Sequence, residues 1–563
     1  MKLRIAAAAW VLLCSGVSAS AQETRVALTP AIAVVKPSWD AAEAEARTLT
    51  GALVSPAAQK DALGALTNAL KDAFAPIAAS SVPVLLPFDT AAYLRARESG
   101  DPGSASNYMS GFRETGFFLA GPAGYDAAFS VRASEVPALS EVSFSYPVVV
   151  EISASALHYR LPPTAGAIEL PAGTLAREFP KLRRFILESY LRYSFERFGV
   201  TYVVSISCFD GRPRARWISC KSADPIARHF LNALNLVGGT PAPLPDAIAS
   251  GPAARPERVS ADFTYHPPGK LLPGTGFRTQ DGVADMTVYA PIRFPFAQAP
   301  AFANSQSFMN WGDCDQTGRT PPPRGRKGAV YRCRVNFKPL VFDESAAENY
   351  SYPWRDNFCE HRYFYVGQCP AGQGHQGQDI RPARCKLENE GADRCQPYQD
   401  DVVAVREGMI LRSGGQEAIF LTSNGPQEHV RFRYMHMHPD YLDADNIVSG
   451  RSVRAGEVLG SAGNFNRREN LTSYHLHFEM MVTTQDGWVR VNPYMTLIAS
   501  YERLLGERGR EVEEPEPTPD AAAVPSSVGM SSGELGTGEV GNGKAAEPAR
   551  KLRRHKLRKK RRR

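Results

Sequence analysis

The chain lacks the long apolar runs that a membrane-spanning helix requires. No apolar run among its 563 residues reaches the roughly 18 residues that mark such a helix, which excludes a polytopic membrane protein. An internal repeat and an H-E-x-x-H motif are also missing, which excludes a repeat architecture and a metalloprotease site of that helical type. Hydrophobic residues make up 43% and charged residues 22%, close to globular averages, so disorder along the whole length is excluded too.

The positive charge of the chain is concentrated at its end. The formal net charge is +7, but residues 551–563 contain ten Lys or Arg and no acid, and without them the balance falls to −3. Residues 511–550 are acidic and then rich in Gly, Ser and Pro, a composition that predicts a disordered linker. The basic tail has no interleaved aromatics for stacking on bases, so no nucleic-acid partner is expected. An anionic envelope lipid or polymer is a fitting partner, and a merely solvated tail is the alternative.

The first 21 residues have the order of an export signal. Lys2 and Arg4 form a charged start, Ile5–Leu13 is a short apolar stretch, and Ala19–Ala21 is a small-residue cleavage site. We therefore expect a mature chain that begins near Gln22. Its predicted location is periplasmic, extracellular or at the cell envelope.

Export favours disulfides over free thiols. The predicted mature chain retains an even number of cysteines, at positions 208, 220, 314, 333, 359, 369, 385 and 395. Sequence leaves the connectivity open; pairing nearest neighbours (208–220, 314–333, 359–369, 385–395) would close four short loops. The rival interpretation is a zinc site built from the last four cysteines, which the absence of any C-x-x-C pair disfavours.

Residues 22–260 form an N-terminal accessory region of mixed α/β character and unknown role, without a catalytic constellation. Its predicted elements are helical spacing over Ala57–Phe74, strands at Val148–Ile152 and Tyr202–Ile206, an amphipathic helix over Lys181–Phe198, and a hairpin over Cys208–Cys220. The histidines of this half are isolated, and we expect structural roles for His158, His229 and His266.

Residues 284–505 form a β-rich segment of short apolar runs and glycine turns, and its histidines carry the chemistry. His375 and Asp379 make an H-x-x-x-D motif; His475 and His477 make an H-x-H motif, followed by Glu479. Residues i and i+2 of a strand point to the same face, so the H-x-H pair would project together. A catalytic zinc needs three protein ligands and an open position. His375, Asp379 and one histidine of the pair supply such a set and leave the other for acid–base chemistry.

A third motif lies between these two. Tyr434-x-His436 reads as a strand, with His438 on the same face, and residues 453–463 alternate small, apolar and glycine residues as a sharply turning β-structure does. His361 and His429 belong to no motif, and we expect both at the surface.

In combination, these motifs resemble the lysostaphin/LytM-type zinc metallopeptidases over residues 360–500. The resemblance implies Zn²⁺ held by His375, Asp379 and His477, and a catalytic pair formed by His436 and His475. It also implies a mostly antiparallel β fold with a duplicated sheet, so the fold class is α+β multidomain. The family's substrate implies hydrolysis of peptidoglycan stem peptides or cross-bridges.

Two departures from the family pattern and two alternative functions stay open. Residues 381–400 are inserted after the motif aspartate, and the cysteines at 359 and 369 precede the motif histidine. Both features would border the groove and alter access to it, and His438 competes with His436 for the catalytic role. The alternative functions are a non-catalytic regulator of cell-wall hydrolases and a secreted protease with protein substrates.

Overall fold

The computed structural model describes the main part of the chain. The described residues are 25–512 except 52–60, 211–216, 270–283, 305–333, 336–337, 340–349, 361, 363, 383–396, 413–417 and 470–471. The predicted export signal, nearly all of the predicted linker, the basic tail, His361 and the cysteine pairs 314–333 and 385–395 lie outside them. No helix among the described residues is long and apolar enough to cross a membrane.

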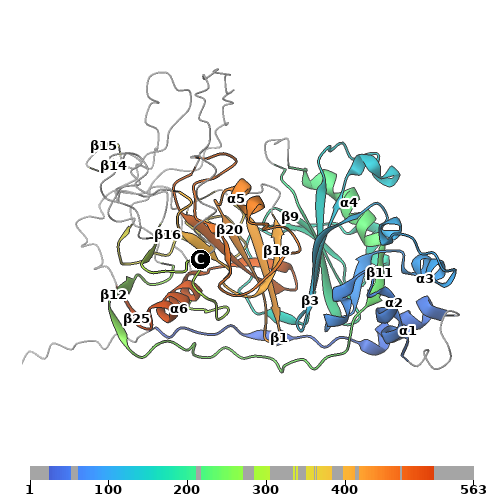
Figure 1. Cartoon of the computed structure of the whole chain (residues 1–563), viewed down its shortest axis with the longest axis horizontal. Helices are drawn as coiled ribbons and strands as arrows, with labels where there is room; N and C mark the ends of the chain where they lie inside the picture. The colour runs from blue at the N-terminus through green and yellow to red at the C-terminus, as the bar shows by residue number, and fades with distance from the viewer. Residues whose placement is uncertain are drawn as a thin grey trace, which may run out of the picture.

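Two antiparallel sheets lie against each other at the centre of the molecule (Figure 1). The seven-stranded N-terminal sheet has the order β3 (Arg113–Gly121), β4 (Gly124–Val131), β5 (Val148–Ser155), β10 (Val200–Ser207), β9 (Tyr190–Arg197), β8 (Arg183–Leu187) and β7 (Ile168–Leu170). The eight-stranded C-terminal sheet has the order β13 (Ala301–Ala303), β16 (Gln378–Pro382), β23 (Leu476–Thr484), β20 (Glu428–Met435), β19 (Ile419–Gly425), β18 (Gly408–Arg412) and β21 (Ser452–Val453), with β24 (Gly487–Val491) paired to β23.

Shorter strand pairs complete the fold, and most of them join parts of the chain that are far apart in sequence. They are β1 (Ile32–Val34) with β6 (Leu157–Tyr159), β2 (Val84–Pro87) with β11 (Leu234–Gly238), β12 (Val259–Tyr265) with β25 (Arg508–Glu511), β14 (Arg334–Val335) with β15 (Lys338–Pro339), and β17 (Asp401–Val403) with β22 (Val458–Ser461). The strands predicted at 148–152 and 202–206 are confirmed as parts of β5 and β10.

Helices lie on the far side of the N-terminal sheet from the C-terminal one (Figure 1). They are α1 (Trp39–Thr50), α2 (Ala62–Leu70), α3 (Thr90–Glu98) and α4 (Cys220–Asn232); α5 (Pro439–Ala444) and α6 (Tyr494–Leu505) belong to the C-terminal half. The helical spacing predicted over 57–74 is confirmed in α2, where the Asp61 side chain caps the first turn by accepting from the Gly64 amide. Leu63, Leu66 and Leu70 form the buried apolar face of this helix.

The amphipathic helix predicted over residues 181–198 is wrong: this stretch is the β8–β9 hairpin. Leu191 and Tyr193 are buried on one face of β9, and Arg192 and Ser194 are buried on the other, against the C-terminal half. Because both faces are covered, the apolar residues do not alternate simply with polar ones, and the spacing imitates a helical period. Two positive-φ residues, at 188 and 189, form its tight turn.

The two sheets are joined by buried polar contacts, and His429 lies at their centre. The expectation that His429 is exposed is wrong, because its side chain is fully buried. Its Nε2 lies 2.6 Å from the Asp126 carboxylate and its Nδ1 lies 2.9 Å from the Ser155 hydroxyl. Ser155 donates in turn to the Leu157 carbonyl, and Asp126 accepts from the Trp488 indole. Although the three groups have the composition of a Ser–His–Asp triad, they are sealed in the interface and act as structural groups.

Two of the nearest-neighbour cysteine pairings are confirmed. Disulfides join Cys208 to Cys220 and Cys359 to Cys369. The second bond rules out the four-cysteine zinc site, because a sulfur in a disulfide cannot serve as a thiolate ligand. The middle of the hairpin predicted between residues 208 and 220 lies outside the described residues; at its described ends the Phe209 amide donates to the Ile218 carbonyl at 2.9 Å, and Cys220 begins α4.

Burial of His158 predicts a stability that depends on pH. Burial, with the neighbouring His429, lowers the pKa of His158 to about 4. The unfolded chain binds this proton near pH 6.5, whereas the folded protein binds it only below about 4. The stabilising effect is therefore complete above pH 6.5 and is lost as the pH falls toward 4, at a cost of about 3 kcal/mol. Urea unfolding at pH 7 and 4.5 should show a smaller loss for His158→Gln than for the wild type; equal losses would contradict this assignment.

Candidate metal centre

The two histidine motifs meet where β16 and β23 pair. Asp379 lies directly opposite His477 in the antiparallel register. The close approach of the strands requires Gly377, because a Cβ there would come within 2.2 Å of the Phe478 carbonyl oxygen. His375 precedes β16 in a loop, where its amide donates to the Glu360 carbonyl at 2.7 Å. Strand pairing thus brings together residues that lie about a hundred positions apart.

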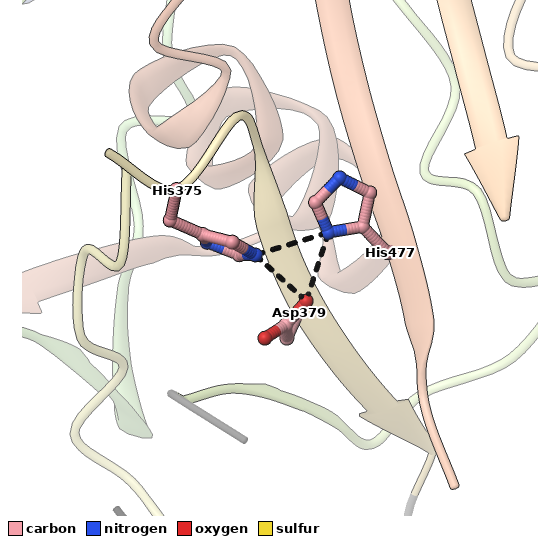
Figure 2. Close-up of side chains that lie close together, drawn as sticks. All are labelled: His375, Asp379 and His477. Atoms are coloured by element: carbon pink, nitrogen blue, oxygen red, sulfur yellow. Dashed lines mark hydrogen bonds and ion pairs between the residues drawn. The ribbon is translucent and has the colours of Figure 1, made fainter. Parts of the chain in front are cut away.

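The side chains of His375, Asp379 and His477 converge on one point (Figure 2). His375 Nε2 lies 3.0 Å from His477 Nδ1, and Asp379 Oδ1 lies 3.3 Å and 3.1 Å from these nitrogens. Ligands about 2.0–2.1 Å from a tetrahedral zinc ion are separated from one another by about 3.3 Å. The triangle of donor atoms therefore has the size that zinc requires.

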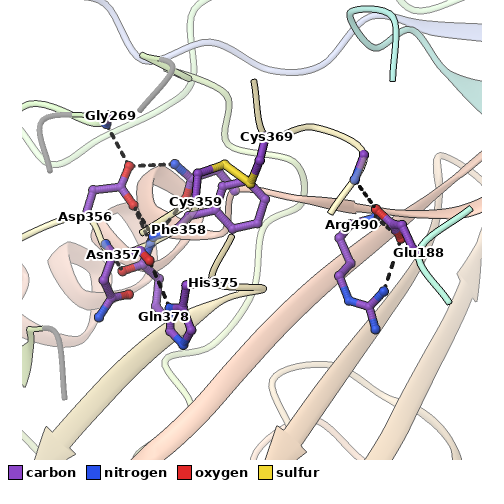
Figure 3. Close-up of a disulfide and its surroundings, with 12 residues drawn as sticks. Glu188, Gly269, Asp356, Asn357, Phe358, Cys359, Cys369, His375, Gln378 and Arg490 are labelled. Carbon is purple, nitrogen blue, oxygen red and sulfur yellow. Dashed lines mark hydrogen bonds and ion pairs between the residues drawn. A yellow bond between two sulfur atoms is a disulfide. The ribbon is translucent and has the colours of Figure 1, made fainter. Parts of the chain in front are cut away.

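The outer nitrogens of both histidines have partners that fix the ring orientation. His375 Nδ1 donates to the Asn357 carbonyl at 2.9 Å, so its Nε2 keeps the lone pair (Figure 3). His477 Nε2 lies 3.2 Å from Glu479 Oε1, so its Nδ1 keeps the lone pair. Three electron-pair donors thus face one another, an arrangement that a cation stabilises. Such outer contacts are typical of histidines that bind metals.

The charges in the site follow from burial and from these contacts. Burial alone would raise the pKa of the Asp379 carboxyl, but the imidazoles of His375 and His475 hold it well below its ordinary range. Burial alone would lower the pKa of His477, but the neighbouring carboxylates of Asp379 and Glu479 raise it. The aspartate is therefore ionised at neutral pH and available as a ligand.

The structure brings two further histidines beside the triangle. His475 Nδ1 donates to the Ser473 carbonyl at 2.8 Å, and its Nε2 is 3.3 Å from Asp379 Oδ1, outside hydrogen-bond geometry. The His436 ring lies 4.6 Å from the His475 ring, and His436 Nδ1 donates to the Phe465 carbonyl at 2.8 Å. Both rings thus keep an unprotonated Nε2. His436 holds this position with a φ of 72°, a backbone strain of the kind that clusters at functional sites.

His438, the competitor of His436, faces elsewhere. Its Nε2 lies 3.1 Å from the Glu469 carboxylate, and its ring packs against Tyr398 and Phe465. Its side chain also accepts from the Asp440 amide at the start of α5. Of the two histidines of this motif, His436 is therefore the one whose ring contacts the H-x-H pair.

Several residues that build the site escape sequence analysis. The fully buried Asp356 accepts hydrogen bonds from the Phe358 amide and the side chains of Gln378 and Asn492, and so holds the segment that carries Asn357 (Figure 3). No motif marks Asp356, since its partners come from three separate parts of the chain. In the sequence, the one local indication of this contact is Gln378, the second glutamine of the motif H-Q-G-Q-D.

Comparison with known proteins gives partial likenesses. No protein-family model and no curated protein matches the chain. Among solved structures, a protein from Ruminococcus gnavus assigned as a glycyl-glycine endopeptidase, lytM, is 24% identical over 24% of this chain and 50% of its own, with a TM-score of 0.18. The antimicrobial peptidase lysostaphin from Staphylococcus simulans is 23% identical over 29% of this chain and 57% of its own, with a TM-score of 0.17.

The chain thus spans little more than half the length of the solved structures that it matches. Identities and TM-scores this low show neither the family nor the function of this chain.

Proposed function

We propose that this chain is an exported zinc-dependent endopeptidase that hydrolyses peptide bonds of bacterial peptidoglycan. The observation that carries the proposal is the convergence of His375, Asp379 and His477, with the Nε2 atom of His475 beside them. Export is proposed from the first 21 residues and agrees with the two disulfides. Peptidoglycan is proposed from the motifs that resemble the lysostaphin/LytM-type peptidases.

The residues divide the chemistry between them. Zinc, when bound, supplies a Lewis acid that polarises a carbonyl and lowers the pKa of a water to about 7. His475 Nε2, kept unprotonated by the hydrogen bond of Nδ1 to a carbonyl, can take a proton from the attacking water and deliver it to the departing amine. His436 Nε2 is available for the same reason, and once protonated it can donate to the oxygen that gains charge.

The test is digestion of peptidoglycan by residues 22–563, with released fragments weighed by mass spectrometry. New amino termini should appear with the zinc-loaded protein and not after chelation. A casein digest run in parallel separates a protease of ordinary proteins from a wall hydrolase. Bound zinc without cleavage of either substrate would contradict the proposed activity and favour the regulatory alternative.

A matched pair of variants tests the choice of His436 over His438. His436→Ala should keep zinc and lower kcat by about 10²–10⁴-fold, the usual contribution of a proton-transfer group. His438→Ala should leave kcat near that of the wild type, because its ring contacts Glu469 and not the H-x-H pair. Zinc content and steady-state rates on a purified wall peptide measure both effects. Equal losses from the two substitutions would contradict the assignment.

A further inference from the structure

The turn of the β8–β9 hairpin carries a buried acid into the C-terminal half. Glu188 is 3% exposed, although it lies at the tip of a tight turn, where a charged side chain is usually exposed to solvent. The hairpin belongs to the N-terminal sheet, whereas the hydrogen-bond partners of the Glu188 carboxylate among the described residues, Gly367 and Arg490, belong to the C-terminal half (Figure 3). Burying a carboxylate is costly unless it is paired, so its partners define its role.

The first partner leads to a proposed zinc ligand. Glu188 Oε2 lies 3.2 Å from Arg490 Nη1, and the Arg490 amide donates to the same carboxylate. Arg490 Nε in turn lies 2.7 Å from Glu479 Oε2. The other oxygen of Glu479 faces His477 Nε2 at 3.2 Å. An unbroken chain of buried charged contacts thus runs from Glu188 to the metal centre.

The second partner leads to another ligand segment. Glu188 Oε1 accepts from the Gly367 amide at 2.9 Å. Gly367 lies in the loop closed by the Cys359–Cys369 disulfide, and the Cys359 amide donates to the His375 carbonyl at 3.0 Å (Figure 3). One carboxylate therefore contacts both the loop that leads to His375 and the arginine that orients the partner of His477.

We propose that Glu188 is a positioning residue for the metal centre, through which the N-terminal region completes the surroundings of two zinc ligands. This inference rests on the proposed function and gives the accessory region a role in it. Glu188 anchors Arg490, and Arg490 holds Glu479 Oε2, so that Oε1 stays directed at His477. Without that anchor Arg490 has only Glu479 as an acidic partner among the ion pairs of the described residues, and Glu479 is shared with Arg433.

The matched control is Glu151, an acid that pairs with an arginine across the same interface. Glu151 Oε2 lies 2.6 Å from Arg431 Nη1, and Arg431 contacts Asp126 instead of Glu479. Glu151→Gln therefore removes a comparable ion pair and leaves the contacts of Glu479 in place. Any effect of general loosening between the two sheets should appear in both variants.

The experiment measures zinc affinity by competition with a chromogenic chelator, for the full mature chain carrying either Glu188→Gln or Glu151→Gln. Glu188→Gln should weaken zinc binding about tenfold or more, as loss of an outer contact to a ligand does, and Glu151→Gln should leave it unchanged. The visible absorption of the Co²⁺-loaded protein should change in Glu188→Gln alone. Thermal unfolding of both variants without metal shows whether either one is destabilised, so that a loss of stability is not mistaken for a loss of zinc affinity.

Arg490→Lys tests the same link from its other end and serves if Glu188→Gln fails to fold. It keeps the charge and loses the guanidinium fork that reaches both acids, so it should also weaken zinc binding. Equal affinities for Glu188→Gln, Glu151→Gln and the wild type would overturn the inference. A wild type that binds zinc but cleaves no peptidoglycan would overturn only the proposed activity, whereas a wild type without zinc affinity would overturn both.

Discussion

Replacing His477 with alanine is expected to abolish both zinc binding and hydrolysis. The substitution removes one of three converging donor atoms and leaves His375 Nε2 and Asp379 Oδ1, 3.3 Å apart, as the remaining pair. Loss of an outer contact to a metal ligand already weakens binding by about 10–100-fold, and loss of a ligand should exceed this. Zinc content after dialysis and release of wall fragments should both fall to the level of the chelated wild type.

The control for this experiment is His475→Ala. It removes a neighbouring imidazole of the same H-x-H motif and spares all three proposed ligands, so the purified protein should keep its zinc. Its kcat should still fall by about 10²–10⁴-fold, because the proton acceptor is gone. If His475→Ala loses zinc and His477→Ala retains it, the ligand and catalytic roles of the two histidines have been exchanged.

Replacing His429 with alanine is expected to lower the free energy of unfolding by about 3 kcal/mol, because the substitution takes a hydrogen-bond partner from a buried carboxylate. The Asp126 carboxylate, 1% exposed, would lose its hydrogen bond to His429 Nε2, which lies 2.6 Å from it. Because the pair joins the two sheets, both should unfold in one transition at lower urea. The fluorescence of Trp488, whose ring lies 5.0 Å from that of His429, and far-ultraviolet circular dichroism should report the same midpoint.

The comparison for His429 is His229→Ala. The His229 ring stacks on Phe112 and its Nε2 contacts the Ser110 carbonyl, and no carboxylate of the described residues forms an ion pair with it. Its removal should therefore cost much less stability. Equal shifts in the two variants would show that the buried pair contributes no more than an ordinary packed side chain, and separate transitions for the two sheets would contradict their coupling.

The candidate metal centre could be proposed from sequence because each half of it is local. His375 and Asp379 are four residues apart, and His475 and His477 are two apart, spacings that place side chains on one side of a turn or strand. The meeting of the two halves follows from pairing of adjacent strands. The spacing from Tyr434 favours His436 over His438 in the sequence, and the structure adds that the His436 ring lies 4.6 Å from the His475 ring.

The role of the N-terminal region could not be predicted for a physical reason. Sequence patterns report which side of an element is apolar, and they assume that the other side meets water. The β8–β9 hairpin and His429 both lie between the two sheets, where polar groups such as Arg192 are covered as well. Arg192 donates to the carbonyls of Asp486 and Trp488. In the sequence, such a buried arginine cannot be distinguished from one on a solvent-exposed face. Burial on both sides is therefore why the helix predicted over residues 181–198 and the exposure predicted for His429 were both wrong.

The pairing of distant segments has a consequence for how the chain acquires its structure. Leu28 bridges to Thr287, and β12 pairs in parallel with β25, so segments about 250 residues apart complete each other. Such contacts carry a large loop-closure cost and form slowly. A ribosome that had produced only the N-terminal sheet would leave its inner face uncovered. We therefore expect most of the native contacts to form after synthesis of the chain is complete, an order of events that agrees with the proposed export.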